Sequence, residues 1–101
     1  MLDLRVKPGR ALIAASILSA DFGRIADEAR SVLDAGADLL HVDVMDGHFV
    51  PNLTMGADMI RGLRKHCPDA ALDVHLMVEN PGMFIDPFAE AGATTFTFHI
   101  E

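Results

Sequence analysis

The sequence predicts an α/β fold built on a parallel sheet, and two observations carry this prediction. Short strand-like segments alternate with segments of helical period along the chain. In addition, Ala35-Gly36-Ala37 precedes one predicted strand, and Ala91-Gly92-Ala93 precedes another 56 residues later. Two βα units of about 28 residues each fill this offset, close to the ~30 residues of a typical unit. Alternating βα units predict parallel strands joined by right-handed crossovers.

The number of predicted units limits the architecture. Four such units make either a small open α/β sheet or half of an eight-stranded barrel. The sequence stops at Glu101, inside or at the very end of a predicted strand, with no helix to cover that edge. Because domains rarely end on a bare apolar edge, we expect the first half of a (β/α)8 TIM barrel, with four parallel strands and intervening helices. In this interpretation residues 1–12 are an N-terminal extension, and residues 13–101 are half of a single barrel domain.

Length and composition exclude several classes of protein. The chain has 101 residues, 50% of them hydrophobic, which suits one globular domain and argues against disorder. No apolar run approaches the ~18 residues of a membrane span, and the first residues lack the apolar segment of a secretory signal. Cys67 is the only cysteine, which favours a cytoplasmic location. The net charge of −7 disfavours nucleic acids and anionic membranes as partners.

Four segments have the pattern of strands: residues 12–18, 39–45, 72–78 and 95–101. Each is short and rich in apolar or β-branched residues. In the last segment, alternation places Phe96, Phe98 and Ile100 on one face and Thr97, His99 and Glu101 on the other.

The segments between these strands predict helices. Helical spacing of apolar residues begins at Phe22, where Asp21 can cap the helix and Gly36 can end it. A loop over residues 47–52 leads to a second helix, which ends before Pro68.

The third helical segment contains a proline. Pro87 cannot sit comfortably inside a helix because it lacks a backbone N–H. We therefore expect one turn from Pro81, a break, and a second short helix with Asp86 as its cap and Pro87 at its first position.

The second and third predicted strands carry the most informative residues. Alternation puts one set of side chains on a common face: His41, Asp43 and Met45 on the second strand, and Asp73, His75 and Met77 on the third. The opposite faces of both strands are apolar. Imidazole and carboxylate groups at inward positions indicate a role beyond packing, and both are ligands for divalent metal ions. The two strands therefore predict a metal site.

These residues lie in runs that resemble a known family. The runs are Ser16-Ile17-Leu18-Ser19-Ala20-Asp21-Phe22, Gly36-Ala37-Asp38, His41-Val42-Asp43-Val44-Met45-Asp46-Gly47-His48-Phe49-Val50-Pro51-Asn52, Asp73-Val74-His75-Leu76-Met77-Val78 and Phe98-His99-Ile100-Glu101. In order and spacing, over about residues 13–101, the chain resembles the N-terminal half of ribulose-phosphate 3-epimerases, which are (β/α)8 barrels. The run of twelve is highly specific. One departure is Ala15, where the family usually has proline.

The resemblance implies roles for particular residues. His41, Asp43 and His75 would be three of four ligands to one divalent metal ion; zinc, manganese, iron(II) and cobalt(II) all suit these mixed donors. Asp43 would also be one of two proton-transferring carboxylates. Contacts to the substrate, a phosphorylated ketose, would come from Ser16, Met45, His75 and Met77. The fourth ligand, which is also the second catalytic aspartate, and the phosphate-binding loops belong to later strands that this sequence does not contain.

The reaction that the resemblance implies converts D-ribulose 5-phosphate into D-xylulose 5-phosphate. The third carbon lies beside a ketone, so loss of its proton gives an enediolate, and return of a proton to the opposite face inverts the centre. This chemistry needs an acid/base group on each face. It also needs positive charge near the enediolate oxygens, which a Lewis-acidic metal supplies.

Two alternatives stay open at this point. Epimerases for six-carbon ketose phosphates, such as allulose 6-phosphate, share the same serine, the His-x-Asp pair and the histidine on the third strand. A non-catalytic half-barrel is the other alternative, because unpaired first and fourth strands would offer edges for self-association into a homo-oligomer. We expect the isolated chain to be inactive or nearly so, since one acid/base group and the phosphate site are absent.

Several other polar residues have predicted structural roles. Asp46 is expected to cap the turn at Gly47. Asp73 and His99 are expected to form hydrogen bonds that support the metal ligands. The loop residues His48, Phe49 and Asn52 are expected either to order the loop or to close over a substrate.

Overall fold

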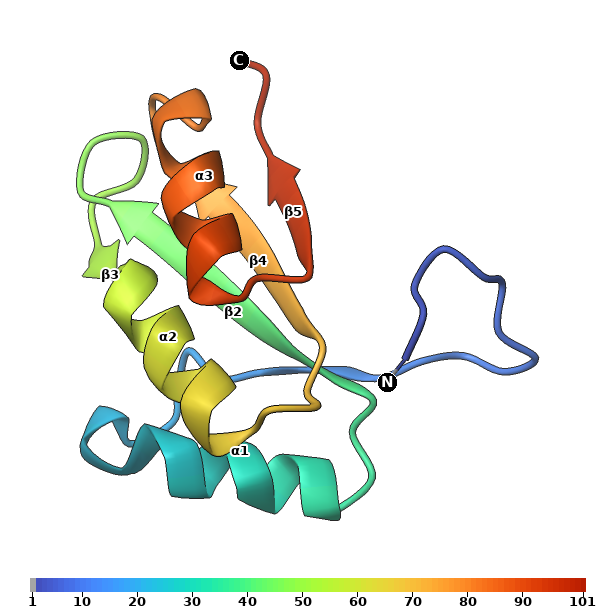
Figure 1. Ribbon diagram of the computed structural model, residues 1–101. Coiled ribbons are helices and arrows are strands. Elements are labelled where there is room, and N and C mark those ends of the chain that lie inside the picture. Colours follow the sequence, from blue (N-terminus) through green and yellow to red (C-terminus); the bar gives the residue numbers. More distant parts are fainter. Residues whose placement is uncertain (1) are drawn as a thin grey trace.

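The elements alternate as predicted in the computed structural model, which describes residues 2–101 (Figure 1). In chain order they are β1 (Ala14–Ser16), the 3-10 turn η1 (Phe22–Arg24), α1 (Ile25–Asp34), β2 (Leu39–Asp46), β3 (Leu53–Thr54), α2 (Ala57–His66), β4 (Leu72–Met77), α3 (Gly82–Ala91) and β5 (Thr95–Phe98). The sheet has the order β1-β2-β4-β5, and these four strands are parallel. This arrangement confirms the predicted α/β class and is consistent with the N-terminal half of a TIM barrel.

One face of the sheet is apolar and lies beneath the helices (Figure 1). On this face β2 and β4 place side chains that are at most 4% exposed: Leu40, Val42, Val44, Leu72, Val74 and Leu76. Ile60 and Leu63 of α2 and Phe88 of α3 belong to the same buried cluster. Burial alternates residue by residue over residues 40–45 of β2 and throughout β4, as expected for strands with one covered face. The hydrophobic core therefore fixes which residues reach the other face.

The repeated Ala-Gly-Ala segments end helices in the same way. Gly36 has φ +116° and Gly92 has φ +121°, a conformation that side-chain-bearing residues rarely adopt. The Gly36 N–H donates to the carbonyl of Leu33, and the Gly92 N–H donates to the carbonyls of Phe88 and Ala89. At the other end of the first helical segment, Asp21 accepts the N–H of Gly23 at 3.0 Å, which confirms its predicted capping role.

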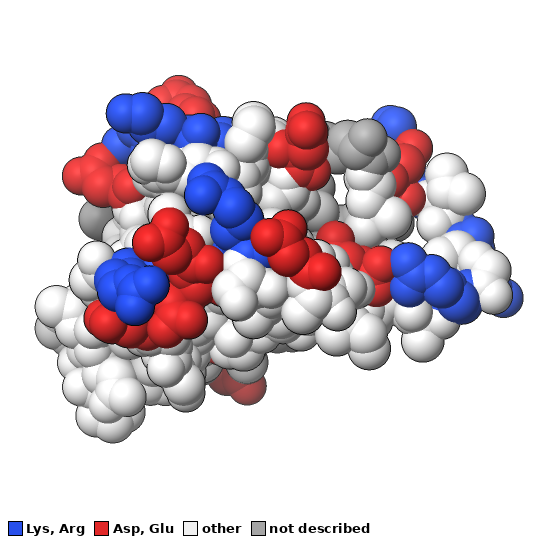
Figure 2. Space-filling model, turned by 90° about the horizontal axis from the view of Figure 1, so that it is seen from below, with Lys and Arg blue, Asp and Glu red and all other residues white. Residues whose placement is uncertain are grey.

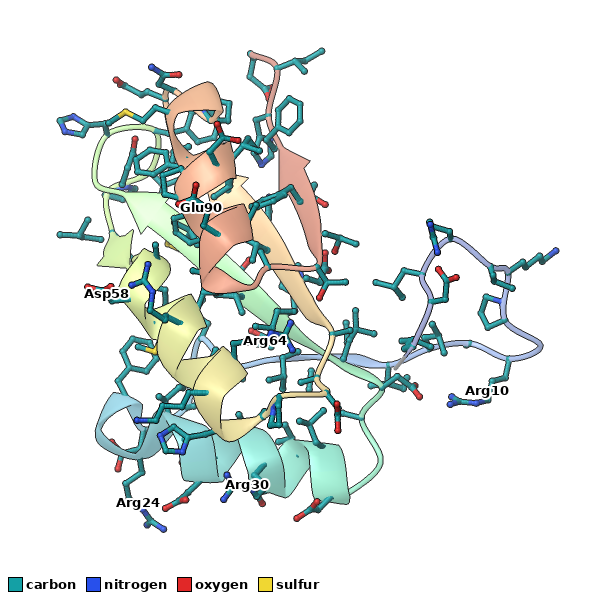
Figure 3. The ribbon with its side chains drawn as sticks, in the orientation of Figure 1. Arg10, Arg24, Arg30, Asp58, Arg64 and Glu90 are labelled. Atoms are coloured by element: carbon teal, nitrogen blue, oxygen red, sulfur yellow. The ribbon has the colours of Figure 1, made fainter. Side chains whose placement is uncertain are left out.

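Arg64 ties the end of α2 to the neighbouring unit (Figure 3). Its guanidinium donates to the carbonyls of Pro68 at 3.0 Å, Ala70 at 2.5 Å and Gly92 at 2.6 Å. A Cβ atom added at Gly92 would approach Arg64 to 2.9 Å. Glycine is thus needed at this position both for its backbone conformation and for the close approach of Arg64.

Both outer strands are shorter than the sequence predicts. The first strand covers residues 14–16 rather than 12–18, and it begins at Ala14 because its neighbour β2 begins at Leu39, which lies opposite. The fourth strand ends at Phe98 rather than at residue 101, because β4 ends one residue after Leu76, the register partner of Phe98. Each has a single neighbour in the described sheet, so the start of β1 and the end of β5 depend on pairing with that one strand.

The predicted break at Pro87 is wrong, since α3 runs without interruption from Gly82 to Ala91. Proline removes one helical hydrogen bond, here the one to the carbonyl of Met83, four residues earlier. Met83 is 63% exposed in the first turn of the helix, where its carbonyl can accept a hydrogen bond from water. The cost of the proline is therefore moderate at this position.

The N-terminal segment extends from the body of the molecule (Figure 1). An ion pair joins it to that body. Arg10 forms a bidentate pair with Asp38, and the N–H of Ile13 donates to the same carboxylate at 2.8 Å. The hydrogen bonds from Arg10 and Ile13 outweigh partial burial and lower the pKa of Asp38 to about 2. This pair links the residues before β1 to the start of β2.

Acidic and basic side chains are interspersed on the face nearest α1 (Figure 2). Within residues 2–101, no helix has the length and apolar character that crossing a membrane requires. The expectations about nucleic-acid and membrane partners stay predictions.

Candidate metal and catalytic site

The register of β2 and β4 brings the predicted site residues together. His41 pairs with Asp73, Asp43 pairs with His75, and Met45 pairs with Met77. Register partners in parallel strands point to the same face, so these residues form three successive rows on the face opposite the helices. The hydrophobic side chains between them are buried in the core, which fixes the orientation of both strands.

Two imidazoles, those of His41 and His75, converge on one carboxylate oxygen of Asp43. Asp43 Oδ1 lies 3.1 Å from His41 Nε2 and 3.2 Å from His75 Nδ1. One donor atom from each residue lies within 4.8 Å of the other two. The side chains of His41, Asp43 and His75 are 27%, 14% and 24% exposed, so they are accessible yet held by their surroundings. The structure thus places the three predicted ligands in one group that could hold a metal ion.

His41 lies between two carboxylates. Its Nδ1 is 2.9 Å from Asp73 Oδ2, while its Nε2 faces Asp43. Burial opposes charge on the imidazole, but the hydrogen bond to Asp73 and the nearby charges of Asp43 and Asp73 together raise the pKa of His41. A neutral ring has only one N–H, so its second nitrogen would present a lone pair to a carboxylate. A proton or a metal cation relieves this repulsion.

The donor set fits a divalent transition metal. Two imidazoles and one carboxylate are borderline to hard ligands, as in many zinc, iron(II), manganese and cobalt(II) sites. Ligand atoms about 2.0–2.2 Å from a tetrahedral ion lie about 3.4 Å from one another. The separations of Asp43 Oδ1 from His41 Nε2 and His75 Nδ1, 3.1 Å and 3.2 Å, are close to this value.

The remaining predicted site residues surround this group. Ser16 is the register partner of His41 on β1 and is exposed on the same face; its hydroxyl accepts the N–H of Leu18 at 3.3 Å. Met45 and Met77 form the next row toward the C-terminal ends of their strands and are half-buried. Their positions suit contacts to a molecule at this end of the sheet, and their role in substrate binding stays a prediction.

The two predicted supporting residues form the expected hydrogen bonds. Asp73 accepts from His41, and the Thr95 hydroxyl donates to Asp73 at 2.6 Å. His99 Nε2 lies 2.8 Å from His75 Nε2, and His99 Nδ1 lies 3.3 Å from Glu101. Sequence analysis assigned no role to Thr95; the signal is its register with Asp73, which pairs the two residues across β4 and β5.

The loop after β2 is anchored by Asp46. This carboxylate accepts the N–H groups of His48 and Phe49 at 2.8 Å and that of Glu79 at 2.9 Å. Burial works against its charge, but these three backbone hydrogen bonds lower the pKa of Asp46. The predicted capping role is thus confirmed, and the Glu79 bond also joins the ends of β2 and β4. The Phe49 ring lies 5.2 Å from the ring of His99, which places the loop beside the site.

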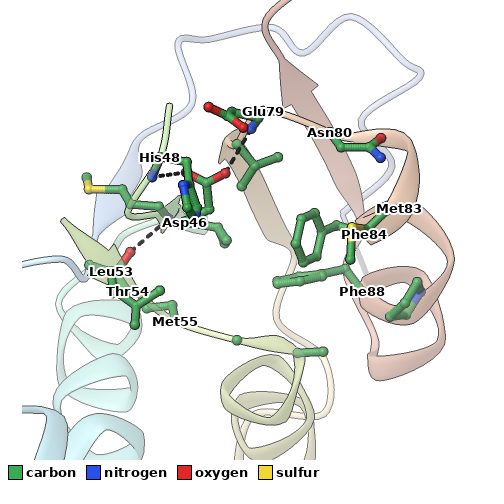
Figure 4. A pocket seen from close by; sticks show the side chains of 16 residues that line it. Asp46, His48, Leu53, Thr54, Met55, Glu79, Asn80, Met83, Phe84 and Phe88 are labelled. Carbon is green, nitrogen blue, oxygen red and sulfur yellow. Dashed lines mark hydrogen bonds between the residues drawn. The ribbon is translucent and has the colours of Figure 1, made fainter. Parts of the chain in front are cut away.

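A cavity of about 840 Å³ lies near the same ends of the strands, between the loop after β2, the start of α2 and α3 (Figure 4). Its walls are largely apolar and include Met55, Phe84 and Phe88. His41, Asp43 and His75 do not line it, because they belong to the opposite face of β2 and β4. Met45 of the neighbouring row lines the cavity, so the cavity adjoins the candidate site without containing the His–Asp–His group.

The fold and the site together define a class of protein: a parallel α/β sheet whose strands carry a His–Asp–His group on the face opposite the helices. A family model described as the ribulose-phosphate 3 epimerase family matches residues 12–101. The chain belongs to this family.

Curated relatives with similar sequences carry the corresponding name. The chain is 59% identical over 91 residues to "Ribulose-phosphate 3-epimerase, cytoplasmic isoform" of Oryza sativa subsp. japonica, a match that covers 90% of this chain and 40% of the relative. It is 57% identical over 93 residues to "Ribulose-phosphate 3-epimerase" of Mycobacterium tuberculosis, covering 92% and 39%. The Escherichia coli (strain K12) protein of that name is 51% identical over 90 residues, covering 89% and 40%. The chain spans about two fifths of the length of these relatives.

Proposed function

We propose that this chain supplies one half of the active site of a metal-dependent enzyme that epimerises D-ribulose 5-phosphate to D-xylulose 5-phosphate. The observation that carries the proposal is the convergence of His41, Asp43 and His75 in a member of this family. The names of the rice, mycobacterial and E. coli relatives support the substrate class.

Asp43 is the proposed acid/base residue for one face of the substrate. Its side chain is 14% exposed, so a substrate carbon placed over the polar face of the sheet can reach it. As a carboxylate it removes the proton from the third carbon, and as a carboxylic acid it returns a proton in the reverse reaction. The two neighbouring imidazoles lie 3.1 Å and 3.2 Å from its Oδ1, so a cation bound by the three residues would fix the position of this oxygen.

His41, Asp43 and His75 are the proposed protein ligands of the metal ion. When bound, a divalent ion supplies positive charge beside the oxygens that become negative as the proton leaves. Ser16, Met45, His75 and Met77 are proposed to contact the substrate. The two methionines form an apolar row beside the acid/base group, and Ser16 offers a hydroxyl on the adjacent strand.

The second acid/base group and the phosphate-binding loops are proposed to lie outside this sequence. The chain alone is therefore expected to turn over ribulose 5-phosphate weakly or not at all. A homo-oligomer formed through the open sheet is the proposed alternative state of the isolated chain. We also infer a cytoplasmic location, in line with the printed name of the rice relative.

A chimera tests the function directly. The 91 matched residues of the rice relative are replaced by the corresponding residues of this chain. We expect the chimera to epimerise ribulose 5-phosphate, and Asp43→Asn in the chimera to abolish turnover, while Asp69→Asn in an exposed turn leaves it unchanged. Faster turnover of allulose 6-phosphate than of ribulose 5-phosphate would overturn the proposed substrate.

A further inference from the structure

His99 lies beside the candidate metal site and contacts one of its predicted ligands, His75. Its Nε2 lies 2.8 Å from Nε2 of His75, and the two rings have centroids 5.0 Å apart. On its other side, His99 Nδ1 lies 3.3 Å from a carboxylate oxygen of Glu101. Phe49 packs against the ring at a centroid distance of 5.2 Å. His99 is thus held on three sides, and its nearest polar neighbour is a predicted metal ligand.

The contact between the two imidazoles restricts where their hydrogens lie. At 2.8 Å one Nε2 donates a hydrogen and the other accepts it. If His99 donated from Nε2 as a neutral ring, its Nδ1 lone pair would face the carboxylate of Glu101. If His75 donates instead, the Nδ1–H of His99 points at Glu101, and the remaining lone pair, on Nδ1 of His75, faces Asp43 Oδ1, where the candidate ion would lie. Each arrangement opposes one pair of acceptors, and the second is favoured because its pair, His75 Nδ1 and Asp43 Oδ1, belongs to the candidate metal group, where a bound cation satisfies both.

The favoured arrangement has a consequence for His75. With the hydrogen on Nε2, the lone pair lies on Nδ1, which faces Asp43 Oδ1 at 3.2 Å. This is the point where the other potential ligand atoms converge. His75 would therefore bind an ion through Nδ1, and the same ring could not do so if its hydrogens were exchanged.

In His41 the two ring nitrogens have the opposite roles to those in His75. Asp73, which is itself hydrogen-bonded by Thr95, faces Nδ1 of His41 and leaves Nε2 toward Asp43. A carboxylate on the outer nitrogen of a ligating histidine fixes its tautomer and orientation. A neutral imidazole performs this task for His75, so the two ligands are presented through different ring nitrogens by different partners.

We propose that His99 is a positioning residue of the metal centre, which accepts the Nε2–H of His75 and thereby presents Nδ1 of His75 to the ion. Glu101 assists by fixing the tautomer of His99. The proposal rests on the metal centre put forward under "Proposed function". It adds which atom of His75 is the ligand and which residue selects it.

The test uses the 101-residue chain labelled with ¹⁵N at histidine and titrated with Zn²⁺. Long-range ¹H–¹⁵N spectra identify the metal-bound nitrogen of each ring. We expect Nδ1 of His75 and Nε2 of His41 to shift on zinc binding, and His75 to carry its hydrogen on Nε2. Calorimetry then measures zinc affinity, with circular dichroism as a check on folding.

Variants separate positioning from simple packing. We expect His99→Ala to weaken zinc binding about 10–100-fold, and His99→Gln, whose amide oxygen can accept the same hydrogen, to recover most of that loss. His66→Ala, at the exposed end of α2, serves as the matched control and should bind like the unmodified chain.

Two results would overturn the inference while leaving the metal centre intact: zinc bound to Nε2 of His75, or unchanged zinc affinity in folded His99→Ala. The spectra of the unmodified chain decide the ligand atom even if the variant does not fold. Failure of the unmodified chain to bind zinc at this site would instead contradict the proposed metal centre, and with it the role of His99.

Discussion

The two faces of the sheet are built from the same strands but serve different purposes. On β4, Val74 and Leu76 are fully buried under the helices, whereas the side chains of their neighbours Asp73 and His75 are about one quarter exposed on the other face. The apolar residues hold the strands in one register, and that register brings the polar residues to a common point. Along each strand, residues that stabilise the fold therefore alternate with residues of the candidate site. Substitutions at adjacent positions can test this division.

The largest expected effect is on catalysis. Asp43→Asn keeps the size of the side chain but removes its ability to take up a proton. In the chimera with the rice relative we expect kcat to fall by about 10²–10⁴-fold, the usual contribution of an acid/base group. Steady-state assays measure this loss, and the midpoint of urea unfolding should change little. Retention of full activity would remove Asp43 from the mechanism.

A substitution on the apolar face of the neighbouring strand β4 should instead lower the stability of the fold. Leu76→Ala deletes a fully buried side chain next to His75 in sequence. We expect a loss of about 2–5 kcal/mol in the free energy of unfolding, from lost burial and a residual cavity. Urea denaturation of the chain provides the measurement, with Leu53→Ala, at an 82% exposed position, as control. Equal losses in both variants would show that the helices do not cover this face as described.

An intermediate effect is expected at the residues that hold His41. Asp73→Asn weakens the hydrogen bond to Nδ1 of His41 without changing the shape of the side chain. We expect zinc affinity to fall about 10–100-fold, and Thr95→Val to cause a smaller loss in the same direction. Calorimetry compares both with Asp69→Asn. Tighter zinc binding by Asp73→Asn would mean that the carboxylate competes with the ion for His41 rather than orienting it.

The smallest expected effect lies far from both faces, at the ion pair of the N-terminal segment. The pKa of Asp38 is lowered to about 2 in the folded chain, against about 3.9 when unfolded. The pair therefore contributes stability above pH 4, and this contribution disappears as the pH falls toward 2. Asp38→Asn should be less stable than the unmodified chain at pH 7, and the two should converge near pH 2. A difference that stays constant over this range would contradict the assignment.

Much of the site follows from the sequence because alternation alone assigns faces. His41, Asp43, Asp73 and His75 could be placed together once residues 39–45 and 72–78 were predicted as strands. Thr95 could not, since its role depends on the register between β4 and β5, which alternation does not specify. Strand ends differ from the prediction for a related reason: the start of β1 and the end of β5 depend on their pairing with β2 and β4, which alternation does not specify.

Local sequence patterns also gave a wrong prediction at Pro87, because the energetic cost of a proline depends on its position within the helix. Pro87 was expected to break its helix, but it lies early enough that only the carbonyl of Met83, in an exposed first turn, loses a partner. The short antiparallel strand β3 has no strong pattern of its own. It forms because Thr54 bonds to both the carbonyl of Asp43 and the N–H of Met45, contacts that only the folded chain reveals.

The central claim is that β2 and β4 aim two imidazoles and one carboxylate at a single cation. Crystals of the chain grown with Zn²⁺ and measured at the zinc absorption edge test it most directly. We predict one anomalous peak about 2.0–2.2 Å from His41 Nε2, an Asp43 carboxylate oxygen and His75 Nδ1. A folded chain with no anomalous peak at this position, or with a peak that contacts only one of the three residues, would contradict the account.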